Sequence, residues 1–306
     1  MGMNRRTEIG RREDLERIEV NWPEGYIGLR LFPKLDRMKQ TGTVYYAALT
    51  ADAAAESTRS KGTAPTTVLL SASRTTYSCA ERVKRYGVAF DEVDNIGGIA
   101  QADRLGAMAS KRSVMRAFED LVVDEVMAGS ADASVSSDLI TKVTAAKKAI
   151  KRYKGRTAFV TSDTTFHAAM TDTEVAARLA TFTSVTPADN AQILALKRTL
   201  LAMVLEVDEV LIGDDDHWYV ATAGGSNNVN IQGRGLVVQL PPVEEESHTM
   251  DPVLGKTVFY LPDGVQPFIL ETHPNEDEKA NKYDAQYYVD VMTLNASAAY
   301  LLDGIT

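Results

Sequence analysis

The most informative stretch of the sequence, residues 76–127, reads TYSCAERVKRYGVAFDEVDNIGGIAQADRLGAMASKRSVMRAFEDLVVDEVM. Its first part continues a strand-like run from Thr75 to Phe90. Its second part predicts one long helix, from Ala100 to Ala128, because apolar side chains recur every three or four residues. They are Leu105, Met108, Met115, Phe118, Val122 and Val126. At 1.5 Å per residue such a helix is about 40 Å long, which suits a structural spine.

The residues before this stretch predict a long hairpin. A strand-like run from Thr43 to Leu49 leads into TADAAAESTRSKGTAPTT, residues 50–67, which is polar and prone to turns. The strand-like pattern resumes at residues 68–70 and at residues 75–90. Arms of about twenty residues would reach roughly 60 Å. An isolated hairpin is marginal in water, so it wraps its own domain or lies on a neighbour. A disordered surface loop is the alternative.

Residues 1–40 read as a charge-rich arm in which arginines alternate with acidic residues. Trp22 and Phe32 belong to an apolar group that would dock the arm onto another surface. A short amphipathic helix followed by a loop within one subunit is the alternative.

From about 135 to 262 helix and strand patterns alternate, which predicts a compact α/β domain. The expected helices cover 136–155 and 188–205, and SDTTFHAAM, residues 162–170, begins a capped helical segment. The expected strands are Thr157–Thr161, Val207–Ile212, Trp218–Thr222, Leu236–Leu240 and Thr257–Leu261.

The last section, 266–306, predicts two strands around the acidic turn HPNEDEKAN, residues 273–281. Apolar and polar residues alternate from Tyr283 to Val291, a period of two. We expect the second strand to continue to about Leu302. The apolar positions change parity near Val291 and Met292, which favours a bulge there.

Composition excludes some classes of protein. The 306 residues are 44% hydrophobic and 25% charged, and the net charge of −9 argues against a body that wraps nucleic acid. The single cysteine, Cys79, excludes an intrachain disulfide and suits a reducing cytoplasm. The charged N-terminus lacks an apolar signal core, and no apolar stretch is long enough to span a bilayer. We expect a soluble protein without a membrane partner.

No motif predicts a catalytic residue, a bound cofactor or a metal ion. The best metal candidate is the run Asp214, Asp215, Asp216 and His217, but calcium and magnesium sites usually draw on spaced ligands. A solvated turn is the favoured interpretation. The glycine-rich stretch 223–228 contains no G-x-S-x-G elbow, and the stretch 232–235 lacks a phosphate-loop Lys-Ser/Thr. The four histidines lack metal spacing.

Charged segments offer candidate contacts between subunits. The expected helix 136–155 carries six Lys and Arg residues, which favours a solvated face over a nucleic-acid contact. The acidic runs Glu244–Glu246 and Glu276–Glu278 are candidate partners for basic patches on adjacent subunits. Arg59, Lys61 and Arg74 lie in the expected hairpin and would meet acidic neighbours.

Four segments resemble the major capsid proteins of tailed bacteriophages, which have the Hong-Kong-ninety-seven-type coat fold shared with encapsulin shells. The first is GLRLFPKLDRMKQTGTVYYAAL, residues 28–49, and the second is the opening stretch, residues 76–127. The third is SSDLITKVTAAKKAIKRYKGRTAFVTSDTTFHAAMTDTEVAARL, residues 136–179. The fourth runs from Ala191 through VDEVLIGDDDHWYV and VLGKTVFYLP to the closing hairpin.

The resemblance implies an α+β fold with five parts. They are an N-terminal arm (1–40), an extension-loop β-hairpin (41–95), a long spine helix (96–130), an axial α/β domain (131–262) and the return strands of a peripheral domain (263–306). It also implies a non-enzymatic function: self-assembly of hexamers and pentamers into an icosahedral virion shell around double-stranded DNA, built in the cytoplasm of a bacterial host.

The implied partners are other copies of the chain, a portal, and scaffold or decoration proteins, with no sequence-specific contact to the DNA. An encapsulin-like cargo compartment and a small α/β metal-dependent enzyme are the alternatives. Some relatives form Lys–Asn crosslinks, but no motif identifies a partner for Lys61, so we expect none. The candidate inter-subunit contacts are Trp22, Phe32, Arg59, Lys61, Arg74, Glu276, Asp277 and Glu278.

Overall fold

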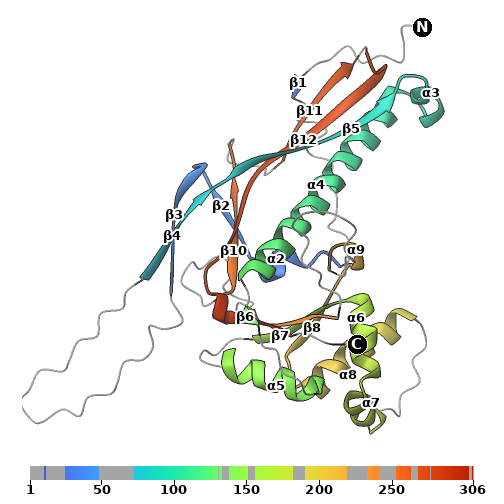
Figure 1. Ribbon diagram of the computed structural model, residues 1–306. Coiled ribbons are helices and arrows are strands. Elements are labelled where there is room, and N and C mark those ends of the chain that lie inside the picture. The colour runs from blue at the N-terminus through green and yellow to red at the C-terminus, as the bar shows by residue number, and fades with distance from the viewer. Residues whose placement is uncertain are drawn as a thin grey trace, which may run out of the picture.

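The protein has an α+β fold with three visible parts (Figure 1). They are an elongated sheet with a long helix along it, a smaller sheet covered by helices, and a two-stranded hairpin that projects from the body. The computed structural model describes residues 10–11, 25–47, 72–129, 131–132, 138–150, 156–181, 190–218, 233–240, 253–262, 268–275, 277–302 and 305.

The long helix, α4, spans Ile99–Gly129, which confirms the predicted spine. It follows the short helix α3 (Glu92–Ile96), which ends where Gly97 and Gly98 adopt positive φ angles of 107° and 96°. Glycine adopts these angles without steric cost, so the chain can turn sharply between the two helices. Leu105 is 42% exposed, although the spacing predicted it on the buried face.

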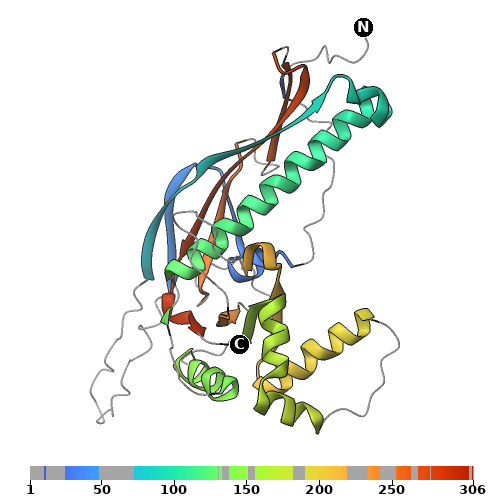
Figure 2. The ribbon, with the colours of Figure 1, turned by 45° about the vertical axis from the view of Figure 1, so that its right-hand side comes forward.

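Strand β12 (Ala280–Thr293) is the axis of the elongated sheet. Along one edge it pairs antiparallel with β11 and then with β10, and along the other edge it pairs antiparallel with β5. Strand β2 adds to β10 in parallel, and β1 adds to β11. The bounds are β1 Gly10–Arg11, β2 Lys34–Arg37, β5 Ala80–Ala89, β10 Gly255–Tyr260 and β11 Phe268–Asn275. Helix α4 lies along this sheet over most of its length (Figure 2).

The smaller sheet has the strand order β6-β13-β9-β7-β8, and only its neighbours β7 with β8 and β13 with β6 are parallel. Strands β7, β8, β9 and β13 are largely buried on both faces, as expected of a sheet with a layer on each side. The bounds are β6 Ala131–Asp132, β7 Arg156–Ser162, β8 Glu209–Gly213, β9 Gly235–Leu240 and β13 Ala299–Leu302. Its helices are α5 Leu139–Ile150, α6 Asp163–Thr171, α7 Thr173–Ala180, α8 Asn190–Leu205 and the short α9 Asp215–Trp218.

Two apolar cores hold these layers together. The larger core joins α4, through Phe118 and Val122, to β12 and to one face of the smaller sheet, through Val160 and Val238. The second core lies on the other face of the smaller sheet, against α5–α8. No helix in the described part of the chain is long and apolar enough to cross a membrane.

Local caps explain why α6 and α7 begin where they do. The Ser162 hydroxyl accepts the Thr165 N–H at 3.1 Å, which confirms the predicted capped segment. The Asp172 carboxylate accepts the N–H groups of Glu174 and Val175 at 3.1 and 3.2 Å. Each cap satisfies N–H donors that a helix start otherwise leaves unpaired.

Two predictions about the C-terminal strand are wrong. Strand β12 ends at Thr293, and the chain then passes through a 3₁₀ turn (Ala296–Ala298) into β13 of the other sheet. The register with β10 continues unbroken through Val291 and Met292, so no bulge forms. The parity changes because both faces are covered there: Val291 packs on the larger core, and Met292 packs on the hairpin side.

Two further placements differ from expectation. Trp218 was expected to open a strand, but it ends α9, and residues 219–222 lie outside the described residues. Strand β10 lies in the sheet of β12, and β13 lies in the sheet of β7. The division into an axial domain (131–262) and a peripheral domain remains a proposal. A division that follows the sheets would assign β10 to the peripheral domain and β13 to the axial domain.

Candidate assembly surfaces

The projecting hairpin consists of β3 (Thr41–Ala47) and β4 (Ala72–Ser78), which pair antiparallel from Thr41↔Ser78 to Ala47↔Ala72. Its side chains alternate between two faces, as strand geometry requires. Tyr45 lies directly opposite Arg74 on the outward face, and Tyr45 is 53% exposed. The outward face is exposed along its described length: Thr41, Thr43, Tyr45, Arg74, Thr76 and Ser78. The hairpin therefore presents a surface that its own body does not cover.

The inward face of the hairpin is anchored to the elongated sheet. Val44, Tyr77 and Cys79 are buried with Val258 and Met292 in one apolar cluster. Burial raises the pKa of the Cys79 thiol to about 11, because the charged thiolate is disfavoured there. This packing fixes the direction in which the hairpin projects.

Backbone hydrogen bonds at the base of the hairpin show which edge of each strand is occupied. The Cys79 N–H donates to the Gln40 carbonyl of the β3 side at 2.9 Å, whereas the Ser78 N–H donates to Asp290 Oδ2 of β12 at 2.8 Å. Successive N–H groups of a strand point to opposite edges. Strands β3 and β12 therefore lie on opposite edges of the β4–β5 run.

It follows that β5 has one edge on which no described strand pairs. Its side chains from Ala80 to Gly87 are all exposed, including Val83 at 46% and Tyr86 at 48%. Arg85 is held within the chain, because it donates to both carboxylate oxygens of Asp284 at 2.6 and 2.5 Å. An unpaired edge is a template for another chain, and the cations Arg82 and Lys84 favour a complementary one.

The predicted acidic turn connects β11 to β12 at the end of the elongated sheet. Asp277 and Glu278 are exposed, and Glu276 lies outside the described residues. Glu278 forms an ion pair with Lys282 at 2.6 Å. A contact of this turn with a neighbour remains a proposal.

The other predicted contact residues have mixed outcomes. Trp22, Arg59 and Lys61 lie outside the described residues. The prediction for Phe32 is wrong, because its side chain is 0% exposed. It fills the space left by Gly255, where an added Cβ would lie 2.3 Å from the ring. Phe32 therefore belongs to the core of its own subunit.

The run Asp214–His217 does not converge on a metal position. Asp214 accepts the Asp216 N–H at 2.9 Å, and Asp215 accepts the N–H and hydroxyl of Thr164 at 3.0 and 2.6 Å. The Asp216 side chain pairs with Arg116, and the His217 side chain pairs with Asp120. Within the described ranges no three His, Cys, Asp or Glu side chains form a candidate metal site. The run forms a short helix with a buried histidine rather than the solvated turn that we expected.

The lysine-rich helix α5 is only partly solvated. Lys148 is exposed, but Lys142 is buried, and residues 151–155 lie outside the described part. The Lys147 ammonium group donates to the Leu205 and Glu206 carbonyls at the end of α8. A cation at a helix C-terminus stabilises its unpaired carbonyls.

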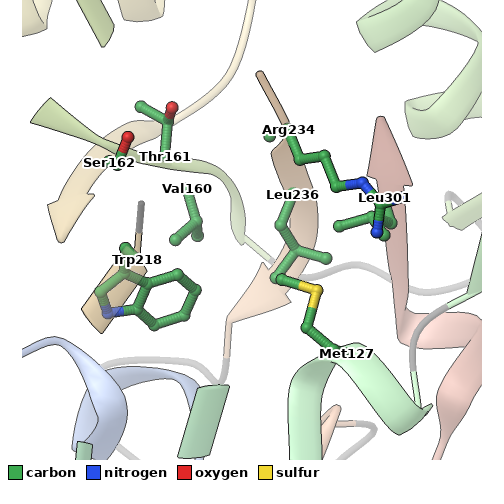
Figure 3. Close-up of a pocket in the computed structure, with 9 residues that line it drawn as sticks. Met127, Val160, Thr161, Ser162, Trp218, Arg234, Leu236 and Leu301 are labelled. Carbon is green, nitrogen blue, oxygen red and sulfur yellow. The ribbon is translucent and has the colours of Figure 1, made fainter. Parts of the chain in front are cut away.

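A small cavity lies between α4 and the smaller sheet (Figure 3). Met127, Val160, Trp218 and Leu301 line it. Its volume of ≈ 10 Å³ is about what one water molecule needs. A drug-sized ligand needs on the order of 300 Å³ or more, so this cavity is not a substrate site.

Solved structures of very low sequence identity match this arrangement over nearly the whole chain. A phage-related protein from Bordetella bronchiseptica RB50 matches with a TM-score of 0.63 and 16% identity, over 98% of this chain and 99% of that one. The capsid protein of cyanophage P-SCSP1u matches with a TM-score of 0.55 and 11% identity, over 94% of this chain and 90% of that one. The fold is the phage-capsid coat fold.

The coat fold also occurs in an encapsulin. The SrpI encapsulin of Synechococcus elongatus PCC 7942 matches with a TM-score of 0.53 and 11% identity, over 96% of this chain and 95% of that one. No family model and no curated protein sequence matches the chain. The coat fold confirms the predicted resemblance and the predicted fold class.

Sequence patterns missed several residues of the candidate surfaces. Tyr45, Val83 and Tyr86 lie in strand-like runs, where alternation alone does not tell which face a neighbour will cover. Tyr45 faces outward because β3 pairs with β4, and the position of Val83 and Tyr86 follows from the pairing of β5 with β12, about two hundred residues away. Only the lack of apolar partners within residues 41–90 indicated that this region leaves surface uncovered.

Proposed function

We propose that this protein is a shell-forming coat subunit, the major capsid protein of a tailed bacteriophage. The observation that carries the proposal is the coat fold over nearly the entire chain, together with a projecting hairpin whose outward face is uncovered. Hexamers and pentamers of the chain would close into an icosahedral shell, and the hairpin and the β5 edge would meet neighbouring copies.

Burial between copies would supply stability that one copy lacks. A two-stranded hairpin buries little surface by itself, so its ordering gains most from contact with another subunit. Obligate interfaces bury roughly 2,000 Å² or more, and binding of a neighbour stabilises the folded state by mass action. The outward faces of β3, β4 and β5 offer uncovered surface of this kind.

We further propose that the shell encloses double-stranded DNA as part of the virion and assembles in the cytoplasm of a bacterial host. The net charge of −9 supports a container that does not grip its contents, because tight binding of phosphates needs surplus cations. A portal and scaffold or decoration proteins would be its other partners. An encapsulin-like compartment with a protein cargo is the second candidate, since the encapsulin match has similar coverage.

A structural role without catalysis fits the side-chain arrangement better than the enzyme alternative. In an enzyme the Asp214–His217 run would have to present its carboxylates to a substrate or metal. Asp215 and Asp216 instead hold Thr164 and Arg116, two residues of the surrounding framework.

Negative-stain imaging of the purified protein tests the proposal directly, and we expect closed particles. Nuclease-protected DNA in particles from infected or induced cells would favour the phage head, whereas a co-purifying protein cargo without DNA would favour the compartment. Purified chain that stays monomeric over a range of concentrations and salt would contradict both. On a boiled denaturing gel we expect only the monomer band, because no crosslink is proposed.

The hairpin contact is tested by Tyr45→Ser. The variant should keep the melting temperature of the isolated subunit, because Tyr45 points away from the body, and should form few or no particles. Met203→Ser is a matched control, since Met203 is similarly exposed but lies on α8. Normal particles from Tyr45→Ser would remove the outward hairpin face from the assembly contacts.

A further inference from the structure

Three chain segments meet at one turn of the spine helix. They are residues 25–28, which precede and begin α2 (Gly28–Leu31), residues 214–218 with α9, and residues 116–120 of α4. The Asp214 N–H donates to the Gly25 carbonyl at 3.1 Å, so the first two segments also touch each other. This meeting point, here called the joint, links the N-terminal segment, the spine and the smaller sheet.

Glu119 lies at the centre of the joint and is fully buried. Its carboxylate accepts N–H groups from Ile27 at 2.8 Å, from Gly28 at 3.1 Å and from the Trp218 indole at 2.9 Å. A buried carboxylate is costly unless several donors replace its water. Two of the donors come from the N-terminal segment and one from α9, so neither segment alone satisfies the charge.

The surroundings leave little room for another arrangement. A Cβ on Gly28 would lie 2.8 Å from Glu119 Oε2 and 2.9 Å from Val122, so only glycine allows this approach. Beside Glu119, the buried His217 ring contacts Asp120 at 2.6 Å and the Tyr26 hydroxyl at 3.3 Å. The titratable groups of α4 and of residues 214–218 near the joint are Arg116, Asp120, Asp214, Asp215, Asp216 and His217.

We propose that Glu119 couples the N-terminal segment to the smaller sheet, so that docking of residues 25–28 and docking of α9 onto the spine stabilise each other. If one segment dissociates from the spine, the buried Glu119 carboxylate loses hydrogen-bond donors. The remaining segment is then bound to the spine less strongly. A partner that pulls on the chain before Gly25 would thereby change how the smaller sheet sits on the spine. The inference rests on these contacts and not on the proposed function.

Amide hydrogen exchange of the full chain tests the coupling in one direction. Trp218→Phe keeps an aromatic ring but removes one donor to Glu119. We expect amide exchange at Ile27 and Gly28 to become about tenfold faster. A hydrogen bond to a charged group stabilises the folded state enough to change an equilibrium constant by roughly this factor. The Trp218 indole is bonded to Glu119 and not to residues 27 and 28 themselves. If Trp218 acted only on its own surroundings, exchange at Ile27 and Gly28 would stay unchanged. Unchanged exchange would overturn the proposal.

The reciprocal experiment perturbs residues 25–28 and measures the response of α9, because coupling between two sites acts in both directions. In a Trp22→Phe background Trp218 is the one remaining tryptophan, as the sequence has two. Gly28→Ala should displace residues 25–28 and shift the Trp218 emission to longer wavelength as water reaches the indole. An emission maximum identical to that of the background protein would contradict the coupling.

A control separates coupling from general loss of stability. Phe159 is fully buried in the second core, on the face of the smaller sheet away from the joint. Phe159→Leu should raise exchange in α5 and in residues 25–28 by similar factors. Trp218→Phe should raise it selectively at residues 25–28. Equal patterns in the two variants would show that Glu119 provides packing without coupling.

Discussion

Gly106 of α4 lies so close to Tyr283 of β12 that a Cβ on residue 106 would lie 2.2 Å from the tyrosine ring. Tyr283 is fully buried, and both its side chain and its backbone form hydrogen bonds with α4. The hydroxyl donates to Asp103 at 2.8 Å, and the Tyr283 carbonyl accepts the Ser110 hydroxyl at 2.8 Å. The spine helix therefore approaches the long strand only because residue 106 has no side chain.

Gly106→Ala should lower the free energy of unfolding by about 1–3 kcal/mol, the usual cost of overpacking a rigid core. Helix propensity alone would predict the opposite, since alanine is the better helix former. Urea denaturation measures the difference. Combining Gly106→Ala with Tyr283→Leu should cost less than the sum of the single changes, because the smaller side chain makes room. Full additivity would mean that the ring is not the obstacle.

Cys79 should be unreactive in the folded protein. Burial raises the pKa of its thiol to about 11, and the thiolate is the reactive form. We expect a maleimide reagent to leave native protein unlabelled at neutral pH and to label urea-unfolded protein fully. The folded state binds the thiol proton more tightly than the unfolded state does. Cys79 therefore stabilises the fold below its ordinary pKa of 9.0, and this contribution is lost as pH rises towards 11. Cys79→Ala should lack this alkaline loss.

Glu119 should make stability depend on pH in the acidic range. Burial raises the pKa of Glu119 above 4.5, and the hydrogen bonds from Trp218, Ile27 and Gly28 offset part of that rise. Because the folded state binds the proton more tightly, this group favours folding below pH 4.5 and loses that contribution as pH rises through its folded pKa. Relative to Glu119→Gln, wild type should therefore lose stability between acidic and neutral pH. A difference that stays constant in denaturation curves across that range would contradict this sign.

The sequence predicted elements whose pattern repeats locally. Helix α4 was placed to within about a residue at each end, because its apolar side chains recur over many turns. Strand β12 was found from its alternation, but its end was not, because residues 299–302 are all apolar and suit a buried strand of either sheet. Only the change of sheet after Thr293 distinguishes the two.

Features that depend on distant partners could not be read from the sequence. Glu119 was one polar position among several between the apolar residues of the spine, yet it is fully buried. The donors that make its burial tolerable lie more than ninety positions away in either direction. Phe32 looked like an exposed anchor for the same reason: the glycine that receives it, Gly255, is far along the chain.

The open edge of β5 makes a prediction that separates assembly from folding. Because the Cys79 N–H points to the β3 side and the Ser78 N–H points to β12, the alternation places the Val83 N–H on the open edge and the Lys84 N–H towards β12. Proline removes the N–H of the residue that it replaces, and strands tolerate it where that N–H faces away from the ladder.

Val83→Pro should therefore leave the fold nearly intact and prevent another chain from pairing with β5. Lys84→Pro is the matched control, because it should break a ladder hydrogen bond with β12 and lower the melting temperature by several degrees. If the β5 edge pairs with a neighbouring copy, Val83→Pro will melt like wild type as a subunit but form few closed particles in negative stain. If it forms particles as efficiently as wild type, neighbours contact β5 through side chains alone or not at all, and the shell must be held by the hairpin face. The two variants introduce the same residue at adjacent positions, and the edge on which the lost N–H lies is the difference that they are chosen to test.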